Sequence, residues 1–368
     1  MRSSPLQLCV VVPTFNEVGN APVLLEKLSA VLKDLSWEVV FVDDDSPDGT
    51  ASTLQWIALQ DERVRVIRRV GRRGLSSACI EGMLSSPAPY LAVMDADLQH
   101  DEHCLPLMFK ALHDESYDVA IGTRYMEGGG TGDWSERRLN ISKGATYLTQ
   151  KILNISMSDP MSGFFMVRRE VLDKSVYRLS SIGFKILLDL VVSSPPGLRL
   201  KEIPFQFGQR LAGESKLDAR VAWDFLLLLA DKTVGRFIPV RLISFAAVGS
   251  IGVLVHLLVL SAAKAIFTLP FVQAQSLAVI FAMVFNFYLN NVLTYRDQQL
   301  RGVNWWGGLI KFMLACGLGG AANVGVANFI FNQDGLWLLS GLAGILVGVI
   351  WNYGVTSIWV WPSRRPKS

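Results

Sequence analysis

The sequence predicts an α/β domain, built on a Rossmann-like mixed sheet, followed by an all-α membrane domain of four helices. Up to about residue 217, short apolar runs alternate with segments of helical periodicity, which is the pattern of βαβ units. After residue 240, four apolar segments follow one another, and each is longer than the ~20 residues that cross a bilayer. We therefore predict an α/β domain at 1–217, amphipathic interfacial helices at 218–239 and a transmembrane domain at 240–368.

The elements of the first domain follow in regular order. We predict strands at 7–13, 37–42, 64–67, 90–94, 118–122 and 200–207, because these runs are mostly apolar and several are rich in Val and Ile. Helices are expected over 23–32, after the loop 43–50, up to about residue 84, and at 103–113, 134–153 and 182–192. Residues 159–167 are expected to form a loop and a further strand.

Oxygen-bearing side chains follow the fourth predicted strand. Asp95, Asp97 and Gln99 are spaced two apart, so in an extended segment they point to one side. Such oxygens suit Mg²⁺ or Mn²⁺, although a D-x-D pair is also common as an acidic turn after a core strand. Pro13 and Asp44 also fall at the carboxyl ends of predicted strands, where α/β sheets bind ligands. This coincidence favours a binding site.

Charge and cysteine usage narrow the class of protein. Eight of the 35 Lys and Arg residues, but only two of the 32 acidic residues, lie in 241–368, so a mildly acidic part precedes a basic, apolar one. Neither part resembles a nucleic-acid binder, and we expect no nucleic-acid partner. The four cysteines are scattered without a C-x-x-C pair, which argues against a zinc site or a disulfide framework and fits a reducing compartment.

The predicted membrane spans are 240–266, 271–294, 307–331 and 336–361. Arg241, Arg296, Arg301 and the pair 364–365 lie on the side of the first domain and the C-terminus, whereas only Lys264 lies near the opposite side. The positive-inside rule then predicts an integral, multi-pass membrane protein whose first domain and C-terminus are cytoplasmic.

Several asparagines lie at membrane depth, and we expect hydrogen bonds between helices in preference to a path for a lipid head group. They are Asn286, Asn290, Asn323, Asn328 and Asn352.

Five motifs resemble those of the inverting GT-A glycosyltransferases (glycosyltransferase family 2) called dolichol- or polyprenol-phosphate mannose synthases. They are Pro13-Thr14-Phe15-Asn16-Glu17, Asp43-Asp44-Asp45-Ser46-Pro47-Asp48-Gly49-Thr50, Asp95-Ala96-Asp97-Leu98-Gln99-His100, Gly122-Thr123-Arg124-Tyr125 and Gly213-Glu214-Ser215-Lys216. The match spans roughly residues 6–236. The last third resembles a GtrA-like four-helix membrane domain. This resemblance implies metal-dependent transfer of mannose from GDP-mannose to dolichyl or polyprenyl phosphate, with Mg²⁺ or Mn²⁺ as cofactor.

The resemblance also implies which residues form the site. Those expected to hold the nucleoside are Pro13, Phe15, Glu17, Val42 and Asp44; those expected around the metal and the diphosphate are Asp95, Ala96, Asp97 and Gln99. Those expected to reach phosphate groups are Arg124, Arg210 and Lys216, while Arg138 and Ser142 lie where the lipid phosphate should arrive. Asp97, Arg124 and Arg138 are the expected catalytic residues. The chain departs from the family's pattern at Phe15, where Tyr is usual, and at Asp101, where Pro is usual.

The reaction itself requires such groups. A divalent ion neutralises the departing diphosphate, and arginines gather two phosphorylated substrates that repel each other. Two alternatives stay open. One keeps the fold and acceptor with another donor, such as UDP-glucose. The other is a membrane anchor or translocator of lipid-linked sugar whose first domain has lost catalysis, and the intact Asp95, Asp97, Gln99 and Arg138 argue against it.

Overall fold

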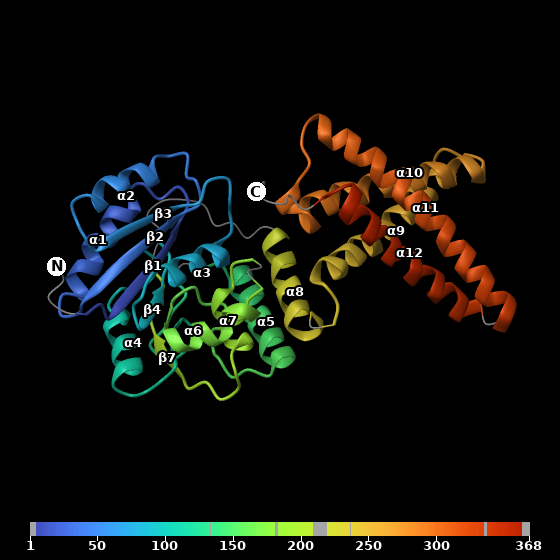
Figure 1. Cartoon of the computed structure of the whole chain (residues 1–368). Helices are drawn as coiled ribbons and strands as arrows, with labels where there is room; N and C mark the ends of the chain where they lie inside the picture. The colour runs from blue at the N-terminus through green and yellow to red at the C-terminus, as the bar shows by residue number, and fades with distance from the viewer. Residues whose placement is uncertain are drawn as a thin grey trace. The chain divides into compact units, whose positions relative to one another are not determined.

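The computed structural model describes residues 5–132, 134–180, 183–208, 219–235, 237–334 and 337–362. The chain divides into two compact units, Met1–Val234 and Gly235–Ser368 (Figure 1). We describe each unit by itself.

A seven-stranded sheet forms the centre of the first unit, with strand order β3-β2-β1-β4-β6-β5-β7. Its strands are β1 (Leu8–Thr14), β2 (Trp37–Asp43), β3 (Val64–Arg68), β4 (Tyr90–Val93), β5 (Val119–Thr123), β6 (Phe165–Arg168) and β7 (Leu200–Pro204). β6 runs antiparallel to β4 and β5, and the other pairings are parallel. The predicted α/β fold with a mixed sheet is confirmed.

Helices cover both faces of this sheet. They are α1 (Asn20–Val31), α2 (Thr50–Ala58), α3 (Leu75–Ser85), α4 (Cys104–His113), α5 (Glu136–Leu153), α6 (Arg169–Ser175), α7 (Ile186–Ser193) and α8 (Ala219–Val234), with a short 3₁₀ turn at Val176–Arg178. β1 is apolar on both faces because each face is covered by helices. Val10 packs into the core formed with α1, α2 and α4, whereas Val11 packs into the core formed with α3, α6 and α7.

A glycine sets how closely α3 approaches the sheet. A Cβ at Gly82 would collide with the side chains of Val11 and Val42, so only glycine lets the helix lie this near β1 and β2. The N-terminus of α3 is thereby held beside the carboxyl ends of these strands, where the candidate site lies.

α8 packs within the first unit. Leu228 is buried in the core beneath α7, and the ammonium of Lys232 lies 2.5 Å from the carboxylate of Asp189 and 2.9 Å from the hydroxyl of Ser193. A buried ion pair ties α8 to α7. The interfacial role expected for 218–239 stays a prediction.

The second unit consists of apolar helices. They are α9 (Val240–Ala265), α10 (Phe271–Leu289), α11 (Val303–Asp334) and α12 (Trp337–Trp359), with a π-helical turn η2 (Asn290–Thr294) and a 3₁₀ turn η3 (Arg296–Gln298). In the described residues, three stretches are long and apolar enough to cross a membrane, Val240–Ala265, Phe271–Thr294 and Val303–Ile330, and Ala343–Trp359 is a shorter apolar helix.

Two asparagines fill glycine notches on neighbouring helices. The amide of Asn286 in α10 occupies the space that a Cβ at Gly252 of α9 would take, and Asn352 in α12 does the same at Gly319 of α11. Each pair therefore brings its two helices close together. Their amide oxygens accept no hydrogen bond from the described residues, so the interhelical hydrogen bonds expected of them stay a prediction.

A third asparagine joins the end of α10 to the C-terminal residues. The side-chain oxygen of Asn291, in η2, accepts hydrogen bonds from the indole nitrogen of Trp361 at 3.1 Å and the backbone nitrogen of Leu300 at 2.8 Å. Its amide nitrogen donates to the Leu300 carbonyl at 3.1 Å. Trp361 also stacks on Tyr295, with ring centroids 4.3 Å apart. Asn291 thus links the π-helical turn to the segment after α12 by a hydrogen bond.

Candidate active site

The acidic turn after β4 presents hard oxygen ligands. The Asp95 side chain is 38 % exposed, whereas Asp97 is buried. The backbone nitrogen of Gln99 donates to the Asp97 carboxylate at 3.2 Å, and the Gln99 amide nitrogen donates to the Gly208 carbonyl at 2.9 Å. Leu98 takes a left-handed conformation, φ 61°, which turns the chain between Asp97 and Gln99. Two carboxylates and an amide oxygen fit Mg²⁺ or Mn²⁺ better than a thiophilic metal.

His100 holds this turn in place. Its Nδ1 accepts the backbone N–H of Asp95 at 3.1 Å, and its Nε2 lies 3.8 Å from the Asp95 carboxylate. The ring stacks on Phe164 with centroids 5.0 Å apart. Burial lowers the pKa of His100, so the ring is neutral and carries its proton on Nε2, because Nδ1 accepts. The hydrogen bond to His100 thus fixes the backbone of Asp95, and the stacking on Phe164 fixes the His100 ring.

The residues expected to hold the nucleoside gather at the ends of β1 and β2. Pro13 and Val42 are register partners in the sheet, and both are buried. Phe15 follows β1, and the Arg73 guanidinium lies 4.2 Å from the centre of its ring. The Glu17 carboxylate accepts a hydrogen bond from Asn20 at 2.7 Å. Three of the five predicted residues thus come from the end of β1 and the turn that follows it, and Val42 comes from the end of the neighbouring β2.

Asp44, the fifth of these residues, also holds the loop that contains Gly74. Its carboxylate accepts the backbone N–H of Gly74 at 2.7 Å and lies 2.8 Å from the buried guanidinium of Arg69. Burial raises the pKa of Asp44, against the effect of both partners. The structure therefore gives Asp44 a structural contact in addition to the expected nucleoside contact.

A second loop places cations beside the acidic turn. Arg124, after β5, meets the fully buried carboxylate of Asp159 through Nε at 2.7 Å and Nη2 at 2.9 Å. The Trp134 ring contacts two guanidiniums, with the Arg124 Cζ 4.8 Å and the Arg138 Cζ 3.9 Å from its centre. A desolvated guanidinium over an indole face is a favourable cation–π contact. The arrangement fixes both arginines near one point.

α5 carries the expected acceptor residues. Ser135 caps this helix by accepting the backbone N–H of Arg138 at 3.4 Å. Ser142, one turn further along, accepts a hydrogen bond from the Tyr125 hydroxyl at 2.7 Å. Because Tyr125 follows Arg124, Arg138 and Ser142 both face the loop after β5, as their spacing predicts. Arg210 and Lys216 lie outside the described residues.

Comparison with known proteins identifies the family. The model of the family "Glycosyl transferase family 2" matches residues 9–176, and that of the "GtrA/DPMS, transmembrane domain" matches residues 244–361. A dolichol-phosphate mannosyltransferase of Pyrococcus furiosus is 35 % identical over 361 residues, which cover 95 % of this chain and 97 % of the relative.

The chain belongs to the dolichol-phosphate mannosyltransferases. The member of this family from Saccharomyces cerevisiae is 38 % identical over 255 residues, 67 % of this chain and 94 % of the relative. The resemblance stated from the motifs is therefore confirmed, and so is the GT-A fold class followed by a transmembrane domain. Among solved structures, glucosyl-3-phosphoglycerate synthase from Mycobacterium tuberculosis, in complex with Mn²⁺ and UDP, has a TM-score of 0.47 at 16 % identity over 62 % of this chain and 80 % of its own.

Three further residues lie in or contact the loops beside the acidic turn, and the sequence analysis named none of them as a site residue. They are Trp134, Asp159 and Lys185. Trp134 comes two residues after the glycine-rich segment 128–132, and Asp159 begins the turn before β6, so both lie in loops that the sequence indicates. Nothing in the sequence near Lys185 indicates that its ammonium reaches the 159–163 loop, because that contact spans 24 residues.

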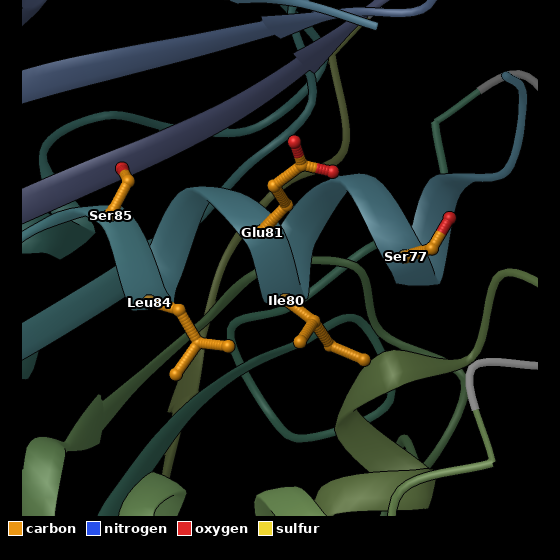
Figure 2. A pocket seen from close by; sticks show the side chains of 5 residues that line it. All are labelled: Ser77, Ile80, Glu81, Leu84 and Ser85. Carbon is orange, nitrogen blue, oxygen red and sulfur yellow. The ribbon is translucent and has the colours of Figure 1, made fainter. Parts of the chain in front are cut away.

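A surface depression lies along α3 (Figure 2). It is lined by Ser77, Ile80, Glu81, Leu84 and Ser85, all from this one helix. Ser77 accepts a hydrogen bond from Arg69 at 2.6 Å, and the Glu81 carboxylate lies 3.4 Å from the same guanidinium. The depression therefore borders Arg69, the ion-pair partner of Asp44, but includes no residue expected to bind donor or acceptor.

Proposed function

We propose that this chain transfers mannose from GDP-mannose to the phosphate of a dolichyl or polyprenyl lipid, with inversion at the anomeric carbon. The relationship to the Pyrococcus furiosus dolichol-phosphate mannosyltransferase carries this proposal, because it spans both units of the chain. In the reaction, a lipid-phosphate oxygen bonds to the anomeric carbon while the bond from that carbon to the β-phosphate breaks and GDP leaves.

The acceptor is already an anion, so the site needs no strong general base. Arg138, seated on Trp134, and Ser142 would hold the lipid phosphate and orient it for attack. Arg124 would face the diphosphate with the part of its guanidinium that Asp159 leaves uncommitted. Pro13, Phe15, Glu17, Val42 and Asp44 would hold the nucleoside.

A divalent cation, Mg²⁺ or Mn²⁺, fits the donor set of Asp95, Asp97 and Gln99. When bound, it neutralises charge on the leaving diphosphate. The side chain of Ala96, between the two aspartates, is buried in the core, so Ala96 would contribute through its backbone. His100 keeps the backbone of the turn in position.

The apolar helices and the match to a transmembrane domain make this an integral membrane protein. The cytoplasmic placement of the first unit follows from the Lys and Arg distribution, and this is the leaflet at which nucleotide sugars are accessible.

The test uses purified full-length protein in detergent with polyprenyl phosphate, Mg²⁺ or Mn²⁺, and either GDP-mannose or UDP-glucose, with the lipid product followed by mass spectrometry. Mannosyl phospholipid from GDP-mannose is expected. Preferential transfer from UDP-glucose would show that UDP-glucose is the donor in place of GDP-mannose. Absence of any transfer would favour a membrane anchor or translocator of lipid-linked sugar.

A further inference from the structure

Lys185 reaches the loop that organises the active site. Its ammonium donates to the carbonyl of Met161 at 3.2 Å and lies 5.0 Å from the centre of the Phe184 ring. Met161 belongs to the 159–163 loop. This loop carries Asp159, which holds Arg124, and Gly163, where a Cβ would lie 3.4 Å from the Asp95 carboxylate.

The charge of Lys185 has no carboxylate partner. Among the described residues, no carboxylate lies within ion-pair distance of its ammonium, and the nearby Asp159 is paired with Arg124. Burial lowers the pKa of Lys185 to about 8, and the guanidiniums of Arg124 and Arg138 act in the same direction, against Asp159 and Asp95. Lys232, by contrast, contacts Asp189 at 2.5 Å.

A donor without an acceptor lies in the same region. The indole N–H of Trp134 is buried and has no hydrogen-bond partner in the described part of the chain. Trp134 contacts both of the guanidiniums that act on Lys185. An ammonium without a carboxylate partner and an indole N–H without an acceptor call for one kind of group, an anion with several acceptor oxygens.

We propose that Lys185 is a phosphate-binding residue of this site, acting together with Arg138 and the indole N–H of Trp134. This inference rests on the proposed function, which supplies two phosphate sources, the nucleoside diphosphate and the lipid phosphate. The ammonium acts as a point charge that balances the phosphate, whereas Arg138 grips it through paired donors. Without phosphate, the desolvated ammonium lowers the stability of the fold.

The test compares Lys185→Met and Lys185→Arg with Lys232→Met in the full-length protein in detergent. One arm measures GDP affinity without lipid by calorimetry, and the other measures KM for polyprenyl phosphate during transfer. Lys185→Met should weaken phosphate binding in at least one arm about 10- to 100-fold, the loss expected for one charge-assisted contact, while its Tm equals or exceeds that of the wild type. Lys185→Arg should recover part of the affinity.

The control should show the opposite pattern. Lys232→Met strands the buried carboxylate of Asp189, so its Tm should fall while the folded protein binds GDP and lipid phosphate as the wild type does. If Lys185→Met weakens GDP binding, Lys185 binds the nucleoside diphosphate. If it raises the KM for polyprenyl phosphate, Lys185 binds the lipid phosphate. Unchanged affinity in both arms, or a fall in Tm with intact binding, would overturn the proposal. If the wild type uses another donor, the proposed function fails, and the first arm is repeated with that donor's nucleoside diphosphate.

Discussion

The carboxylate of Asp159, which is 0 % exposed, holds the Arg124 guanidinium by two contacts of 2.7 and 2.9 Å. Both partners are thereby removed from water, so each depends on the other to remain charged at low cost. Nε and Nη2 are committed to this contact, and Nη1 is the nitrogen that would face a phosphate in the proposed site. Arg124 is therefore a residue whose direction is set before any substrate arrives.

Asp159→Asn should lower the free energy of unfolding by about 3–5 kcal/mol, the usual loss when one member of a buried ion pair is neutralised. The transfer rate of the remaining folded protein should also fall, because Arg124 loses its orientation. A matched control is Asp61→Asn, since Asp61 holds Arg63 by a similar paired contact of 2.9 and 2.6 Å in a more exposed position. This change should cost less than about 1 kcal/mol. Equal losses in thermal unfolding would contradict the role assigned to burial.

Asp97→Ala should abolish metal-dependent transfer, with a loss of about 10²–10³ in rate or more, because the leaving diphosphate is then poorly neutralised. Titration of the wild type with Mn²⁺ in the presence of GDP should show a bound ion that the variant lacks. Full activity in excess EDTA would contradict this assignment.

Arg138→Ala should raise the KM for lipid phosphate and slow transfer, with little change in GDP affinity measured without lipid. Arg138→Lys should recover only part of the loss, because an ammonium lacks the paired donors and stacks less well on Trp134. Arg137→Ala removes the same charge from the neighbouring, exposed position and serves as control. Loss of GDP affinity with an unchanged lipid KM would place Arg138 in the donor site.

The Lys and Arg distribution predicts the topology of the membrane domain. A reporter fused after Ser368 should be cytoplasmic, and a tag near Thr268, between α9 and α10, should be accessible from outside. The reverse labelling pattern in intact cells would contradict the predicted orientation.

Lys185 should make stability depend on pH. Its folded-state pKa of about 8 lies below the ordinary value near 10.4, so the unfolded chain binds the proton more tightly between these values. The free energy of unfolding should therefore rise as pH increases from about 8 to about 10. The Tm advantage of Lys185→Met should be largest below pH 8 and shrink towards pH 10. A difference that does not vary with pH would contradict the desolvation of this ammonium.

Local patterns predicted most of the first unit. Each predicted strand overlaps an observed one, because a run such as Leu8–Pro13 is buried on both faces of the sheet and is apolar at every position. The antiparallel insertion of β6 between β4 and β5 could not be predicted, since strand order depends on long-range packing. The same holds within the site: motif spacing indicated Asp95, Asp97 and Arg138, but the pairing of Arg124 with Asp159 exists only once two separate loops meet.

The hydrogen bond between Asn291 and Trp361 has a consequence for the folding of the second unit. Its acceptor oxygen binds the indole of Trp361, 70 residues later in the chain. At about 5–20 residues per second, a ribosome needs roughly 4 to 14 s to synthesise that interval. The contact between the end of α10 and the segment after α12 therefore cannot form until Trp361 has been synthesised.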